Sequence, residues 1–149
     1  MKPFIQAAAI LTAAMIAAAI TWAVSPPAEA TACDPSAIQA DEICLQSIPE
    51  DKQVLWIDAR PRSDWENNGL EGSILWNFDP TEDFNAMEAE AVMKIFETPY
   101  VVIYCADQGC GTSRKIAKHI TTKLQLEAEV HVLHNGWKAL EAAGKTLEP

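Results

Sequence analysis

The chain is short of positive charge. Lysine and arginine together number 11, against 21 aspartate and glutamate residues, so the formal net charge is −10 over 149 residues. Proteins that bind nucleic acid contact its phosphates through lysine and arginine, and anionic membrane surfaces attract the same residues. The composition therefore argues against nucleic acid as a partner and against docking on an anionic membrane surface. It favours an acidic, solvated surface.

Histidine is also scarce, and its positions do not suggest a metal site. His119, His131 and His134 lack the spacing typical of metal ligands, and the sequence shows no obvious acidic partner for them. We therefore expect neither a metal site nor another cofactor. The chain contains no internal repeat, and its length favours a single domain.

The first 30 residues differ from the rest. Lys2 precedes an apolar stretch over residues 4–24, and prolines and a small-residue site at Ala28 and Ala30 follow. Two interpretations stay open: a signal peptide cleaved after Ala30, or an uncleaved membrane anchor, for which about 20 apolar residues suffice. Both predict that the remainder is exported, to the periplasm or the outside of the cell, and the second predicts membrane attachment through residues 4–24.

Export changes the interpretation of the four cysteines, because disulfides persist outside the cytoplasm. Cys33 and Cys44 lie in residues 31–45, which we interpret as a linker or lead-in. One straight helix would place them about 16 Å apart, whereas a disulfide needs Cα atoms within roughly 7 Å. A Cys33–Cys44 bridge therefore requires this segment to fold back near Pro35, and the sequence leaves the pairing open.

Strand-like and helix-like segments alternate over residues 46–149, which we interpret as the folded domain. Strands are expected at residues 54–58, 73–78, 100–105 and 129–133. Helices are expected in residues 59–69, 80–99, 112–124 and 136–144. The second helix holds five apolar residues near helical spacing: Phe84, Met87, Ala91, Ile95 and Phe96. The third would begin at Thr112 as its N-cap. The tryptophans expected to pack in the core or at its rim are Trp56, Trp65, Trp76 and Trp137. The alternation predicts an α/β fold, a parallel sheet flanked by helices on both faces.

Cys105 ends the most apolar predicted strand, and a short polar loop joins it to the next helix. Open parallel sheets bind ligands at the carboxyl ends of their strands. Loop N–H groups and the helix dipole would stabilise a thiolate on Cys105. The predicted anion-binding residues are Ala106, Asp107, Gln108, Gly109, Gly111, Thr112 and Ser113. A buried, inert core cysteine is the alternative.

Four blocks resemble the rhodanese-like family over roughly residues 45–149. They are WIDARPRSDW (56–65), NGLEGSILWN (68–77), VVIYC with its loop (101–113) and VLHNGWKALEAAG (132–144). The resemblance implies an enzyme of the thiosulfate sulfurtransferase type, in which Cys105 takes a sulfane sulfur from a small donor as a persulfide and passes it to a thiol or similar acceptor. Asp58 and Arg60 match the family's Asp-x-Arg block, and we expect an ion pair that braces the loop.

Three departures from the family bear on the substrate. No lysine or arginine lies between Cys105 and Ser113, and Asp107 adds negative charge, so thiosulfate is a doubtful physiological donor. The loop length is similar to that of the phosphatase branch of this fold, but Gly111 stands where that branch has arginine, so phosphate-ester chemistry is not expected. Asn68 and Gly69 replace the family's Gly-His.

Cys110 opens a second interpretation of the same loop. It could act as a resolving thiol that attacks a persulfide or sulfenic acid on Cys105 and forms a disulfide, which would make the protein a thiol–disulfide or persulfide redox protein. A third interpretation is a binding module that keeps the fold without catalysis. The sulfurtransferase is the leading interpretation, and the other two stay open as alternatives.

Overall fold

The computed structural model describes residues 33–107, 109 and 111–145. The predicted leader, residues 1–30, lies outside the described residues, as do Gln108 and Cys110. Within the part of the chain that is described, no helix is long and apolar enough to cross a membrane.

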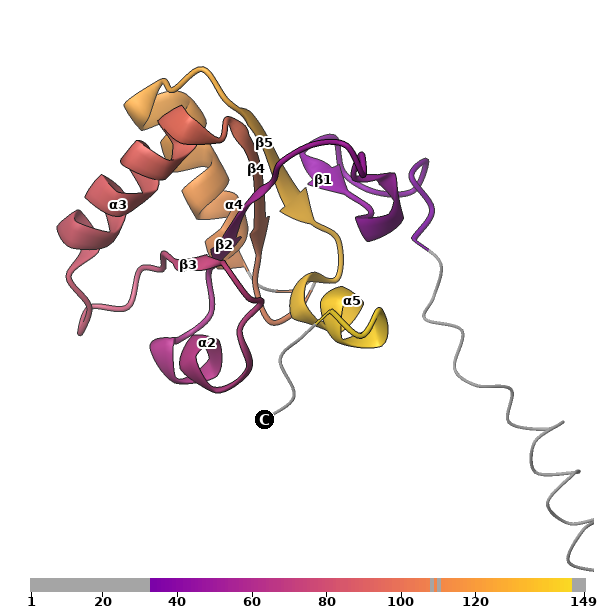
Figure 1. The fold of residues 1–149 in the computed structure, drawn as a ribbon, viewed down its shortest axis with the longest axis horizontal. Coiled ribbons are helices and arrows are strands. Elements are labelled where there is room, and N and C mark those ends of the chain that lie inside the picture. Colours follow the sequence, from indigo (N-terminus) through magenta and orange to yellow (C-terminus); the bar gives the residue numbers. More distant parts are fainter. Residues whose placement is uncertain (1–32, 108, 110, 146–149) are drawn as a thin grey trace, which may run out of the picture. The chain divides into compact units, whose positions relative to one another are not determined.

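Five parallel strands form one sheet in the order β1-β5-β4-β2-β3 (Figure 1). The strands are β1 (Glu42–Ile43), β2 (Leu55–Asp58), β3 (Ile74–Leu75), β4 (Tyr100–Tyr104) and β5 (Glu129–Leu133). β4 lies in the centre and is buried along its whole length. All strands being parallel, their carboxyl ends meet at one edge of the sheet, and Cys105 follows β4 at that edge.

Helices connect the strands, as the alternating pattern predicts. They are η1 (Leu45–Ser47), α2 (Arg62–Asn68), α3 (Phe84–Glu97), α4 (Gly111–Lys118), η2 (His119–Leu124) and α5 (Gly136–Ala142). The helix expected over residues 112–124 is therefore two pieces, because α4 passes into the π-helix η2 at His119. The expected N-cap was wrong, since α4 begins at Gly111 and Thr112 is its second residue.

Two apolar cores cover the two faces of the sheet, which confirms the predicted layers. Val101 and Ile103 of β4 face the core that includes buried residues of α3, α4 and η2. The alternate β4 residues Tyr100, Val102 and Tyr104 face the core that includes α5. Figure 1 shows α3 and α4 on one side of the sheet and α5 on the other. This alternation is the period of two expected of a strand buried on both faces.

Residues 31–45, interpreted from the sequence as a linker or lead-in, contribute a strand that was not predicted. Residues 42–43 form β1, which pairs with β5 and extends the sheet. Cys33 and Cys44 form a disulfide with a Cα–Cα distance of 5.6 Å, so the segment does fold back. Among the aromatic residues, Trp76 and Trp137 are buried and Trp56 and Trp65 are half-buried, as expected. Phe96, at helical spacing with the buried residues of α3, has a side chain that is 74% exposed.

Candidate active site

Cys105 sits where β4 meets its loop, and it is nearly buried. Its exposed fraction is 5%, and its Sγ lies 3.9 Å from the carbonyl oxygen of Ala59, just after β2. The Ala59 N–H donates to the Tyr104 carbonyl at 2.8 Å, which holds the end of β2 against the end of β4. None of the three described cysteines, Cys33, Cys44 and Cys105, is a free thiol.

The side chain of Asp107 contacts both its own loop and α5. Ala106, Asp107 and Gly109 are exposed, and the Gly109 N–H donates to Asp107 Oδ1 at 2.9 Å. Asp107 Oδ2 lies 3.6 Å from Lys138 Nζ on α5. One of the N–H groups expected to hold an anion on Cys105 is therefore engaged by a carboxylate.

The remaining predicted loop residues belong to the helix that follows. Gly111, Thr112 and Ser113 form the first turn of α4, and Ser113 is buried. Their predicted role, N–H groups that face an anion at a helix N-terminus, remains a prediction. The other two residues of the predicted site, Gln108 and Cys110, lie outside the described part of the chain.

Asp58 and Arg60 form the predicted ion pair, and it is buried. Arg60 Nη2 lies 2.8 Å from Asp58 Oδ2, and the two side chains are 3% and 0% exposed. Burial would lower the pKa of Arg60, but the Asp58 carboxylate outweighs it and raises that pKa, so Arg60 stays a cation. Arg60 Nη1 also donates to Asn68 Oδ1 at 3.1 Å, and Asn77 Nδ2 donates to the Arg60 carbonyl at 2.9 Å.

The closing segment that starts α5 lies directly against Cys105. The Trp137 N–H donates to the Cys105 carbonyl at 2.7 Å. Gly136 has φ +51°, and a Cβ there would lie 2.1 Å from the Cys105 carbonyl oxygen. The positive φ and the close approach together require glycine at this position.

Tyr104 precedes Cys105 in sequence, but its hydroxyl is occupied by hydrogen bonds that hold the fold together. Its hydroxyl accepts from the Leu70 N–H at 3.1 Å and donates to Ser73 Oγ at 3.2 Å. Burial, reinforced by the Asp58 charge, raises the pKa of Tyr104 well above its ordinary value. The phenol therefore remains protonated and holds the α2–β3 connection against β4.

A second buried carboxylate at this edge was missed by the sequence analysis. Glu42, on β1, has a side chain that is 2% exposed. It forms an ion pair with Arg114 Nη2 of α4, and it lies 3.1 Å from His134 Nδ1 just after β5. Burial would raise the pKa of Glu42, but His134 and Arg114 together lower it below its ordinary value. These residues are 72 and 92 positions from Glu42 in the chain, so no local pattern links them.

Each histidine has an acidic partner, contrary to the expectation from sequence. His119 pairs with Glu88, His131 with Glu129 at 3.2 Å, and His134 with Glu42. The rings of Trp76, Phe78 and Phe84 surround His119, with centroids within 6.4 Å. Among the described residues, no three histidine, cysteine, aspartate or glutamate side chains are grouped to hold a metal ion.

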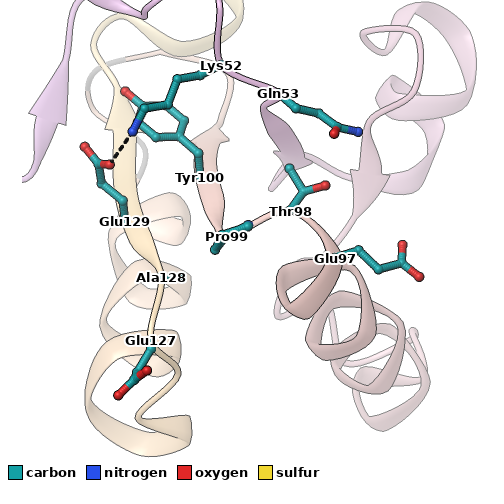
Figure 2. Close-up of a pocket in the computed structure, with 9 residues that line it drawn as sticks. All are labelled: Lys52, Gln53, Glu97, Thr98, Pro99, Tyr100, Glu127, Ala128 and Glu129. Carbon is teal, nitrogen blue, oxygen red and sulfur yellow. Dashed lines mark hydrogen bonds and ion pairs between the residues drawn. The ribbon is translucent and has the colours of Figure 1, made fainter.

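A surface hollow of about 350 Å³ lies at the other edge of the sheet, where β4 and β5 begin. Figure 2 shows Lys52 reaching over the Tyr100 ring to Glu129, an ion pair of 3.1 Å. Cys105 is at the opposite end of β4, about 16 Å along the strand. This hollow is therefore separate from the candidate active site.

Comparison with known proteins agrees with this architecture. No curated protein matches the chain. Among solved structures, it is similar to the N-terminal domain of a protein from Clostridium difficile 630 that carries a provisional ATP/GTP-binding name, with 16% identity and a TM-score of 0.51 over 69% of this chain and 98% of that one. The BH2092 protein from Bacillus halodurans is 14% identical, with a TM-score of 0.47 over 63% of both chains.

At 16% identity and a TM-score of 0.51, the first of these solved structures indicates a shared fold alone. The sequence profile of the Rhodanese-like domain matches residues 43–143, which span the sheet from within β1 through α5. The chain therefore belongs to the rhodanese-like family.

Proposed function

We propose that the protein is a sulfurtransferase that carries a sulfane sulfur as a persulfide on Cys105. The observation that carries the proposal is the position of Cys105, at the carboxyl end of the central buried strand and just before α4. Parallel sheets bind ligands at this edge, and a helix N-terminus favours an anion. Membership of the rhodanese-like family supports the same chemistry.

The reaction would proceed in two displacements. The Cys105 thiolate attacks the outer sulfur of the donor, a new S–S bond forms, and the electrons of the broken bond leave with the rest of the donor. A thiolate acceptor then attacks the outer sulfur of the persulfide, takes that sulfur, and releases the Cys105 thiolate. In this mechanism the Asp58–Arg60 ion pair positions the loop, and neither residue is required to transfer a proton.

A second function, thiol–disulfide or persulfide redox chemistry with Cys105 and Cys110, is supported by a different observation. None of the described cysteines is a free thiol. In that case Cys110 would attack the inner sulfur of the persulfide, form a disulfide with Cys105 and release hydrogen sulfide, with the dithiol oxidised and the sulfane sulfur reduced.

The intact mass of the reduced full chain distinguishes these functions. The chain is exposed to thiosulfate and, separately, to polysulfide, with Cys105→Ser as the matched variant. Gain of one sulfur atom in the wild type alone supports the sulfurtransferase. Loss of two hydrogens, abolished by Cys105→Ser and by Cys110→Ser, supports the redox pair. No change with either donor contradicts both and favours a non-catalytic binding module.

We also propose that the protein acts outside the cytoplasm. The support is the apolar stretch over residues 4–24 together with the Cys33–Cys44 disulfide, since such bridges persist in oxidising compartments. Fractionation of expressing cells, with protease added before and after lysis, tests the location. A protein found only in the cytosolic fraction would contradict it.

A further inference from the structure

The arginines that follow β2 and the Cys105 loop are already paired with carboxylates. Arg60 is held by Asp58 in the buried pair described above. Arg114, in the second turn of α4, is the basic residue that follows the loop most closely in sequence, and it pairs with Glu42. Its Nε also lies 3.9 Å from Asp41 Oδ2. Two carboxylates therefore face the guanidinium of Arg114, and one of them is almost fully buried.

The cation contributed by α5 is paired as well. Lys138 follows Trp137, whose N–H binds the Cys105 carbonyl, and its ammonium lies 3.6 Å from the loop carboxylate of Asp107. Both partners are exposed, so this pair is weaker than that of Arg114. The other basic residue beside the loop, Lys115, lies on the exposed side of α4. The four basic residues named here are thus equalled in number by the four carboxylates of Asp41, Glu42, Asp58 and Asp107.

The pairing of cations with carboxylates affects which sulfur donor the site can bind. Thiosulfate carries two negative charges beside its sulfane sulfur, and a site that binds it gains from unneutralised cations. An organic hydropersulfide, R–S–S–H, presents an uncharged sulfur in its protonated form. We propose that Glu42 and Asp107 are specificity-determining residues that select an organic hydropersulfide over thiosulfate, by neutralising Arg114 and Lys138.

This inference rests on the proposed sulfurtransferase function and names its donor class. The Cys105 thiolate attacks the terminal sulfur of R–S–S–H and forms Cys105–S–S–H, while the S–S bond of the donor breaks and its electron pair leaves with R–S⁻. The proton of the persulfide then passes to solvent or to the departing thiolate. No oxidant or reductant is consumed in this exchange.

The test compares two donors on the reduced full chain: sodium thiosulfate and the hydropersulfide of 2-mercaptoethanol. The initial rate of sulfur gain is followed by intact mass. We expect the wild type to take sulfur from the hydropersulfide at least about tenfold faster. Glu42→Gln and Asp107→Asn should each raise the thiosulfate rate by roughly three- to tenfold and lower the ratio of the hydropersulfide rate to the thiosulfate rate. Adding Arg114→Gln to Glu42→Gln should remove that gain.

Glu129→Gln is the matched control, because it changes the net charge by the same amount at the opposite edge of the sheet. It should change neither rate. Equal rates with both donors in the wild type, or equal effects of all three single variants, would overturn the inference and leave the sulfurtransferase standing. Failure of both donors to load sulfur would overturn the proposed function and this inference with it. Since Asp107 is exposed, Asp107→Asn keeps the test decisive even if Glu42→Gln does not fold.

Discussion

The guanidinium carbon of Arg60 lies 3.9 Å from the ring centroid of Trp137, at the start of α5. Arg60 is thus held on one side by the Asp58 carboxylate and on the other by an aromatic face. Through it, the segment after β2 contacts the segment that binds the Cys105 carbonyl. Two parts of the chain far apart in sequence are joined here beside Cys105.

Arg60→Ala should strongly destabilise the protein. It leaves the Asp58 carboxylate buried without its cation, which typically costs about 3–5 kcal/mol of unfolding free energy. Urea unfolding followed by circular dichroism measures the change. Arg62→Ala is the control, because Arg62 pairs with Glu82 but is itself 44% exposed and should matter far less. Equal losses in the two variants would contradict the importance of burial.

Gly136→Ala tests the close approach of α5 to Cys105. The new Cβ would overlap the Cys105 carbonyl oxygen, so the variant should lose both stability and the capacity to load sulfur on Cys105. Gly144→Ala is the matched control, since Gly144 also has a positive φ, +63°, but open space around its Cβ position. It should lose only the about 1–2 kcal/mol of backbone strain. If both variants lose the same free energy in urea, the contact with Cys105 has no energetic weight.

The depressed pKa of Glu42 predicts a specific dependence of stability on pH. A carboxyl group whose pKa is lower in the folded state stabilises the protein above its unfolded pKa, ordinarily 4.5, and loses that contribution as the pH falls. Glu42→Gln has no such group, so its unfolding free energy should fall less steeply below pH 4.5 than that of the wild type. Urea titrations at several acidic pH values measure the two slopes. Parallel curves would show that Glu42 does not contribute.

Loss of the Cys33–Cys44 bridge should lower stability by about 3 kcal/mol, as expected for a bridge between residues 11 apart in sequence. Urea unfolding of Cys33→Ala and of the double variant Cys33→Ala/Cys44→Ala measures this. The single variant already opens the bridge and leaves the fully buried Cys44 in place. It should therefore show most of the loss. A small loss in the single variant and a large one in the double would assign the effect to core packing instead.

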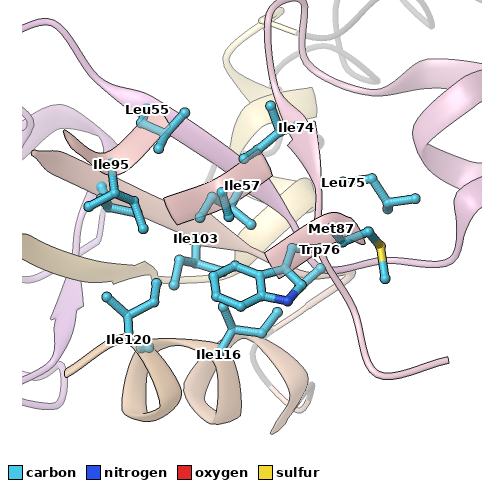
Figure 3. Packing of buried hydrophobic residues seen from close by; sticks show 14 of the residues in the cluster. Leu55, Ile57, Ile74, Leu75, Trp76, Met87, Ile95, Ile103, Ile116 and Ile120 are labelled. Atoms are coloured by element: carbon cyan, nitrogen blue, oxygen red, sulfur yellow. The ribbon is translucent and has the colours of Figure 1, made fainter. Parts of the chain in front are cut away.

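The buried parts of the fold were the most predictable from sequence. β2, β4 and β5 match their predicted ranges to within one residue, because long apolar runs arise from strands with both faces covered. Figure 3 shows the result, with Ile57 and Ile103 from neighbouring strands packed around Trp76 and against Ile116 of α4. Phe96 has helical spacing to the buried residues of α3 but is itself exposed, because helical spacing alone does not mark the edge of the buried face.

The non-local features could not be predicted. β1 has only two residues, and its place in the sheet depends on pairing with β5 residues that lie 90 positions later in the chain. The Asp58–Arg60 pair was predicted, because its residues are two positions apart and share one motif. Glu42 and Arg114 are 72 positions apart, so only the folded chain brings them together. The candidate nucleophile was visible in the sequence, but its electrostatic surroundings were not.

The two outermost strands of the sheet are very short. β1 and β3 have two residues each, and they form the two borders of the sheet. Exposed strand edges are where chains join edge to edge and aggregate, and short borders offer few free N–H and C=O groups for that. The protein is thereby protected against growth of its sheet by strand addition.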